Sequence, residues 1–170
     1  KSILRGQVLV TERDHEGKLL AATGVQLPGV LDDVYADRAT KATLGPTVKG
    51  DRATLAVWAP TARSVSLELY DTPSGSPSVT PMRRDDRSGV WSATGPWKGK
   101  YYKYRVEAWQ PAVQRVVTAS VTDPYSVALA ADSTHSLVAD LTDPSLSPAG
   151  WDRLRKPAAV PATRTQITEL

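Results

Sequence analysis

The chain has 170 residues, a formal net charge of +3, 13 prolines and no cysteine. This length holds one β-sandwich of roughly 100 residues with flanking segments, and the sequence lacks the apolar run of ~20 residues that a membrane-spanning helix needs. The absence of cysteine excludes disulfides and thiol chemistry, and the scattered basic residues favour a solvated surface over a nucleic-acid-binding face.

The sequence starts at Lys1 rather than Met and shows no signal peptide. We therefore expect the chain to be part of a longer protein. Its compartment stays open, because many secreted proteins lack disulfides. A secreted protein is the first expectation, and a cytoplasmic protein is the alternative.

Residues 1–40 are expected to form an extension that consists of a small hairpin and a short helix. Two apolar runs, at residues 6–10 and 18–22, flank Asp14-His15-Glu16-Gly17, whose glycine suits the turn of a hairpin. Residues 28–36 carry acidic side chains early and apolar ones on one side, which is typical of a short helix.

From Leu44 to about Leu141 the periodic signals are those of β-strands. Strands are expected at residues 53–58, 63–70, 79–82, 90–93, 100–109, 113–121 and 136–141. Turn-forming residues separate them and no helical pattern interrupts them. The spacing predicts an all-β fold, an immunoglobulin-like antiparallel β-sandwich over residues 41–142. Trp58 and Trp91, which lie beside small residues, are expected in its core.

The strand expected at residues 63–70 has two distinct faces. Val65, Leu67 and Leu69 alternate with polar residues, so this apolar set faces a core. Tyr70 belongs to the opposite set and is therefore expected to face water.

Trp109 ends the strand expected at residues 100–109. Tyr102 and Tyr104 face the core, whereas Trp109 shares the opposite face with charged residues. An exposed ring with polar neighbours suits sugar stacking, because flat rings match the apolar faces of pyranoses. Packing on another domain and coverage of an edge of the core are open alternatives for both Trp109 and Tyr70.

Residues 143–165 contain four prolines and are expected to be an extended linker. Residues 166–170 then alternate between polar and apolar side chains, which is typical of a strand. A native domain seldom ends on an unpartnered strand, so we expect another domain to begin there.

A search for catalytic groups predicts none in this chain. Glycoside hydrolysis needs two carboxyl groups that face each other across the bond, roughly 5–10 Å apart. The acidic pairs Asp32-Asp33 and Asp85-Asp86 are sequence neighbours whose side chains diverge. His15 and His135 lie too far apart, without other ligands at suitable spacing, to predict a zinc site. No catalytic residue, metal ligand or cofactor is therefore expected.

Several motifs together resemble the N-terminal sandwich of pullulanases. They are Leu55-Ala-Val-Trp-Ala-Pro-Thr-Ala62, Gly89-Val-Trp91, Lys100-Tyr-Tyr-Lys-Tyr-Arg-Val106 and Val121-Thr-Asp-Pro-Tyr-Ser126. Outside the sandwich, Gly24-Val-Gln-Leu-Pro-Gly-Val-Leu-Asp-Asp-Val-Tyr35 resembles the segment that precedes it in bacterial pullulanase-type α-1,6-glucosidases. This sandwich is the family 48 carbohydrate-binding module, which precedes glycoside hydrolase family 13 barrels that act on α-1,6 branch points. Residues 166–170 look like the start of the first barrel strand.

The resemblance implies a non-catalytic fragment of an enzyme that debranches starch, glycogen or pullulan. The family's catalytic carboxylates lie in the barrel, beyond Leu170. The implied partners are the catalytic barrel of the same polypeptide and α-glucan, with no nucleic acid and no membrane. Starch-binding members use two aromatic platforms, and Trp109 matches one of them better than Tyr70 matches the other. The alternative is an immunoglobulin-like protein-interaction domain without glucan binding.

Overall fold

The computed structural model describes residues 1–156 and 158–166 and contains two units, residues 1–140 and 141–170. The described residues of the second unit form three short 3₁₀ turns, at Pro144–Leu146, Trp151–Arg153 and Ala162–Arg164. They contain no strand, and nearly all of them are exposed. The strand expected at residues 166–170 lies, apart from Gln166, outside the described residues.

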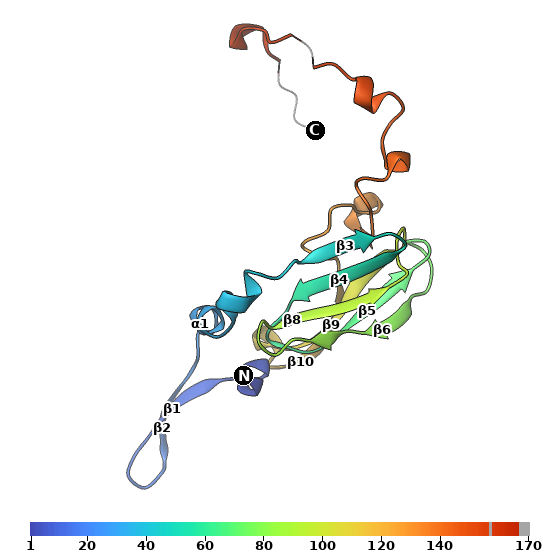
Figure 1. Cartoon of the computed structure of the whole chain (residues 1–170). Coiled ribbons are helices and arrows are strands. Elements are labelled where there is room, and N and C mark those ends of the chain that lie inside the picture. Colours follow the sequence, from blue (N-terminus) through green and yellow to red (C-terminus); the bar gives the residue numbers. More distant parts are fainter. Residues whose placement is uncertain (157, 167–170) are drawn as a thin grey trace. The chain divides into compact units, whose positions relative to one another are not determined.

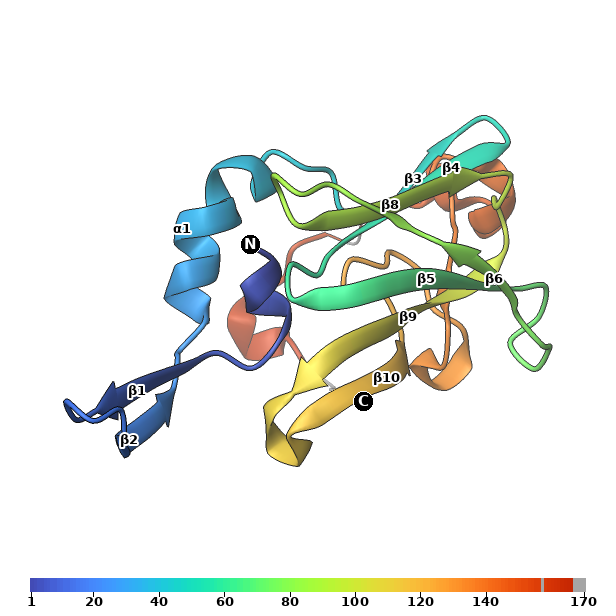
Figure 2. The same cartoon turned by 90° about the horizontal axis from the view of Figure 1, so that it is seen from below.

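Two antiparallel sheets form the predicted β-sandwich (Figures 1 and 2). One has the order β3-β4-β8-β7, made of β3 (Gly45–Lys49), β4 (Arg52–Trp58), β8 (Val90–Gly95) and β7 (Arg83–Arg84). The other has the order β10-β9-β5-β6, made of β10 (Arg115–Val121), β9 (Tyr101–Gln110), β5 (Ala62–Tyr70) and β6 (Ser78–Pro81). The short strand β11 (Ser136–Leu137) pairs with the start of β9.

The corner at residues 59–61 carries the chain from one sheet to the other. It joins β4 to β5, which belong to different sheets, and the indole N–H of Trp91 donates to the carbonyl of Ala59 at 3.0 Å. The core lies between the sheets and contains Leu67, Tyr102 and Tyr104, each of which is completely buried. The alternation of β5 and β9 therefore assigned the core face correctly.

Trp91 and Trp58 differ in burial, although both were expected in the core. Trp91 is buried in the core cluster. Trp58 is half-buried and lines a surface pocket beside the N-terminal helix, and its indole N–H donates to the carbonyl of Ser88 at 2.9 Å. Trp58 ends β4, where the sheet meets the helix, so its ring lies at the margin of the core.

The N-terminal extension contains a 3₁₀ turn, a hairpin and a helix. These are Ser2–Arg5, β1 (Leu9–Arg13) paired with β2 (Leu19–Gly24), and α1 (Pro28–Ala39). Figure 2 shows α1 at one end of the sandwich and the hairpin projecting away from it. The helix begins where it was predicted and is three residues longer, and its Tyr35 is only 1% exposed.

The hairpin turn lies where it was predicted, but β1 lies three residues later in the chain. The carboxylate of Asp14 accepts the N–H groups of Glu16 and Lys18 at 3.0 and 2.9 Å, and Gly17 has a φ of +83°. Pairing thus starts directly beside the turn and includes residues 11–13. The alternation rule missed these polar residues because both strands are exposed throughout.

Candidate functional site

Tyr70 is buried, contrary to the expectation that it faces water. Its side chain is only 9% exposed, its hydroxyl donates to Oε2 of Glu68 at 3.0 Å, and its ring meets that of His135 edge-on with 4.5 Å between centroids. The hydroxyl of Ser120 donates to the same Glu68 oxygen. Burial, reinforced by Glu68, raises the pKa of Tyr70. The segment that leads into β11 brings His135 over this face, which alternation along β5 alone does not reveal.

Replacing Tyr70 by Phe is expected to lower the free energy of unfolding by about 1 kcal/mol, because Glu68 loses one buried donor while the ring packing stays. Urea unfolding measures this loss. Tyr125→Phe serves as the matched control, since Tyr125 is 40% exposed and its loss of a hydroxyl should change stability by less than ~0.5 kcal/mol. Equal stabilities of the two variants would contradict the structural role of the Tyr70 hydroxyl.

Trp109 is half-buried and lines a surface pocket of about 360 Å³. The sandwich contributes Trp109 together with Pro111 and Gln114 from the turn between β9 and β10. The N-terminal extension contributes residues 6–9 and 24–27, except for Gln26. The pocket therefore lies where the two ends of the hairpin meet the end of β9. Trp109 was expected to be exposed. It is half-buried, and residues of the N-terminal extension line the same pocket.

The two candidate rings are far apart. Tyr70 pairs with Tyr101 at the start of β9, and Trp109 lies eight residues further along this strand. At about 3.3 Å per residue the separation is about 26 Å. The structure does not bring Tyr70 and Trp109 into one site.

A polar groove lies on the outer face of the sheet that contains β5 and β9, and the sequence did not predict it. It has a volume of about 230 Å³ and is lined by Ser64, Ser66, Val79, Arg105, Glu107 and Thr118. The hydroxyl of Ser64 donates to Oε2 of Glu107 at 3.0 Å. Glu107 precedes Trp109 by two residues on the same face of β9. Alternation along β5 and β9 predicts which polar residues face outward. It does not predict that the two strands are neighbours, and the groove exists only because they pair.

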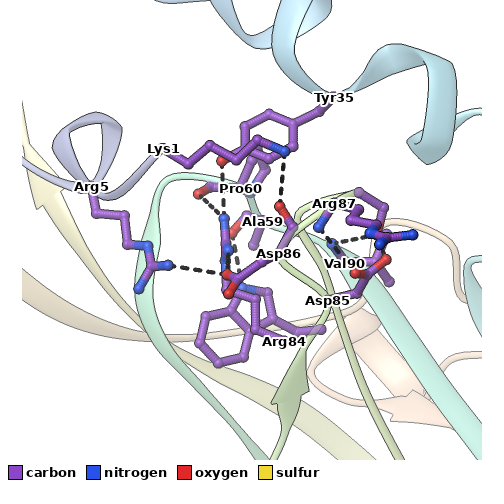
Figure 3. Close-up of polar contacts among 12 residues, drawn as sticks. Lys1, Arg5, Tyr35, Ala59, Pro60, Arg84, Asp85, Asp86, Arg87 and Val90 are labelled. Carbon is purple, nitrogen blue, oxygen red and sulfur yellow. Dashed lines mark hydrogen bonds and ion pairs between the residues drawn. The ribbon is translucent and has the colours of Figure 1, made fainter.

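Arg84 joins three segments of the chain in a polar cluster that we call the Arg84 clamp, made of Lys1, Arg5, Tyr35, Arg84 and Asp86 (Figure 3). The Arg84 side chain is 7% exposed and pairs with Asp86, and its Nη2 donates to the hydroxyl of Tyr35 at 3.1 Å. Nη2 of Arg5 donates to Asp86 at 3.4 Å, and Nζ of Lys1 donates to the Asp86 carbonyl at 3.1 Å. The clamp thus holds both the start of the chain and α1 on the sandwich.

The acidic pair Asp85-Asp86 forms a turn and does not form a facing pair. Asp85 accepts the N–H of Arg87 at 3.0 Å and the hydroxyl of Ser88 at 2.7 Å, and the hydrogen bond from Ser88 lowers the pKa of Asp85. Asp86 points instead toward Arg84 and Arg5 (Figure 3). The two carboxylates have separate structural partners.

Among residues 1–156 and 158–166, no three His, Cys, Asp or Glu side chains lie close enough together to hold a metal ion. No helix in this part of the chain has both the length and the apolar character needed to cross a membrane.

Two family models match the chain. Residues 43–126 match carbohydrate-binding module 48 (isoamylase N-terminal domain), and residues 1–33 match the pullulanase N2 domain. The pullulanase of Klebsiella pneumoniae is 38% identical over 92% of this chain and 15% of the relative. Pullulanase 1, chloroplastic, of Arabidopsis thaliana is 33% identical over 100% of this chain and 18% of the relative. The chain thus spans 15–18% of the length of these relatives.

The chain is also similar to solved structures of pullulanases. Ligand-free PulA from Klebsiella pneumoniae superposes with a TM-score of 0.83 and 39% identity, over 89% of this chain and 15% of that chain. A pullulanase from Paenibacillus barengoltzii, in complex with maltohexaose and α-cyclodextrin, has a TM-score of 0.60 and 29% identity, over 76% of this chain and 19% of that chain.

Proposed function

Because residues 43–126 match carbohydrate-binding module 48 and the chain is 38% identical to a pullulanase over 92% of its length, we propose that it is a non-catalytic N-terminal part of a debranching enzyme that hydrolyses α-1,6-glucosidic bonds. In this proposal residues 1–140 pack against the catalytic barrel of the same polypeptide and bind α-glucan at Trp109. The observation that carries the binding role is the Trp109 ring at the wall of an accessible pocket.

The surroundings of Trp109 support an uncharged, hydroxyl-rich ligand. An indole face suits the apolar face of a pyranose, while neighbouring polar groups exchange hydrogen bonds with sugar hydroxyls. The polar groove, which contains Ser64, Ser66 and Thr118 beside Arg105 and Glu107, lies on the same outer sheet face. The similar Paenibacillus barengoltzii structure contains maltohexaose and α-cyclodextrin, so α-1,4-glucan oligomers are the natural probes.

The hairpin supports the packing role. Leu9, Val10, Leu19 and Leu20 are between 48% and 60% exposed on a two-stranded ribbon, and such ribbons are marginally stable alone. The relatives are several times longer than this chain, so a large covering surface is available in a polypeptide of that length. We assign hydrolysis to that further length as well, since the acidic pair near Arg84 is used in a turn. The comparisons give no support to a general protein-interaction domain.

Trp109→Ala is expected to weaken binding of maltoheptaose or β-cyclodextrin at least tenfold, which corresponds to about 1.4 kcal/mol of lost stacking and burial. Isothermal titration calorimetry on the chain and on the variant measures this change.

Tyr125→Ala is the matched control, because Tyr125 is an aromatic residue of the same unit, is 40% exposed and lines a different pocket, so its loss should leave affinity unchanged. Equal and negligible heats for the chain and for Trp109→Ala would eliminate glucan binding at Trp109 and leave the packing role.

A further inference from the structure

We propose that the Trp109 site is composite, with the N-terminal extension forming one wall and with Gln7 and Gln114 as its hydrogen-bonding side chains for sugar hydroxyls. This inference rests on the proposed function. It assigns part of the glucan site to residues outside the carbohydrate-binding module match, which covers residues 43–126.

The pocket walls come from both parts of the chain. Residues 6–9 lead into the hairpin and residues 24–27 lead out of it, and all of them except Gln26 line the pocket together with Trp109. The N–H of Val25 donates to the carbonyl of Val8 at 3.0 Å, which joins the two segments into one wall. Pockets between two structural parts are frequent ligand sites, and about 360 Å³ lies in their usual range of ~300–1,000 Å³.

The chemistry of the wall fits an uncharged glucan. The pocket lining contains two glutamines, which carry amides, and the apolar residues Val8, Leu9, Val25, Leu27 and Pro111 in addition to Trp109. An amide both donates and accepts, as the hydroxyls of a sugar require, and it carries no charge that would demand an ion. The pocket lining contains no Lys, Arg, Asp or Glu, so a charged ligand would find no partner in it.

Gln114 has an unusual backbone conformation. Its φ is +49° and its ψ is +39°, in the left-handed region that is unfavourable for a residue with a Cβ and that glycine adopts freely. Strained backbone positions cluster at ligand and active sites, and Gln114 belongs to the lining of this pocket.

The extension wall is held on the sandwich before any ligand arrives. Nε of Arg63, on β5, donates to the carbonyl of Arg5 at 3.3 Å, directly before residues 6–9. The Arg84 clamp fixes Lys1 and Arg5 on one side and Tyr35 on the other, so the segments that flank the hairpin are anchored at both ends (Figure 3). The wall needs little ordering on binding, which favours affinity.

Gln7→Ala and Gln114→Ala are each expected to lower the affinity for maltoheptaose about threefold to tenfold, the effect of one lost hydrogen bond. Calorimetric titration gives the affinities, and thermal unfolding checks that both variants stay folded. Gln26→Ala is the matched control, because Gln26 lies between two wall residues, is exposed and does not line the pocket. Its affinity should equal that of the unchanged chain.

Hydrogen exchange provides a second measurement that does not depend on any variant. Saturating maltoheptaose should slow amide exchange in residues 6–9 and 24–27 as well as around Trp109.

The outcomes separate this inference from the proposed function. If Trp109→Ala abolishes binding while both glutamine variants keep full affinity and exchange in the wall stays unchanged, the site belongs to the sandwich alone and the composite site is overturned. If the unchanged chain gives no heat with glucan, the proposed binding role fails and the composite site fails with it.

Discussion

Asp123→Ala is expected to lower the free energy of unfolding by about 3–5 kcal/mol, because it removes the acceptor of several buried donors at once. Asp123 is 4% exposed, and its Oδ2 accepts the hydroxyls of Tyr102 and Tyr104 at 2.7 and 3.0 Å. Its Oδ1 accepts the N–H of Tyr125 at 2.8 Å. Both tyrosine side chains are completely buried members of the core cluster, so their hydroxyls depend on a partner inside the protein. Urea unfolding followed by tryptophan fluorescence measures the change.

Asp37→Ala is the matched control for this prediction. The Asp37 side chain is 87% exposed and pairs with Lys41 one helical turn away, a contact worth about 0.5 kcal/mol or less. A loss at Asp123 no larger than the loss at Asp37 would show that the two tyrosine hydroxyls find other partners.

The same contacts predict how the core responds to high pH. Burial and the neighbouring carboxylate of Asp123 raise the pKa of both Tyr102 and Tyr104. Above the ordinary pKa of about 10, the unfolded chain therefore loses protons that the folded chain keeps. The stability that these hydroxyls contribute is present below pH ~10 and falls as the pH rises further. The ultraviolet absorbance of ionised tyrosine should accordingly include these two rings only when the protein unfolds.

The sequence was sufficient for the sandwich because its strands repeat with a period of two. The apolar residues of β5 and β9 lie on the core face as alternation predicted, since one face of each strand is buried between the sheets. Alternation failed for Tyr70, because a segment that is distant in the chain covers the outer face there and brings His135 against the ring. A period along one strand cannot reveal which other segment packs on it.

At the candidate site, too, features of a single strand could be predicted, whereas contacts between distant segments could not. Trp109 could be singled out from its own strand, because it shares a face with charged residues. Its pocket could not, since the walls come from residues 6–9 and 24–27, roughly a hundred positions earlier in the chain. The Arg84 clamp could not be predicted either, because its members come from residues 1–5, from α1 and from residues 84–86. From the sequence, Asp85-Asp86 indicated only a solvated turn and gave no sign of the contacts of Asp86 with Arg84 and Arg5.

Gly89→Ala is expected to cost about 3 kcal/mol of unfolding free energy, the second large effect. Gly89 has a φ of +73°, a conformation that costs an alanine about 1–2 kcal/mol. A Cβ there would lie 2.7 Å from Cβ of Pro60 and 3.4 Å from Cδ1 of Tyr35. Pro60 is rigid and accepts a hydrogen bond from Arg84, so relief requires movement of the corner or of α1 and adds about 1–3 kcal/mol. Urea unfolding measures the total.

Gly99→Ala separates backbone strain from the steric clash. Gly99 has a φ of +79°, but no atom lies within 4 Å of an added Cβ, so this variant should cost only about 1–2 kcal/mol. The difference between the two variants then reports the clash of the added Cβ with Pro60. Because Tyr35 anchors α1 on the sandwich, Gly89→Ala should also speed amide exchange in α1, whereas Gly99→Ala should leave it unchanged. Equal losses of stability with unchanged exchange in α1 would mean that the corner yields without disturbing the Arg84 clamp.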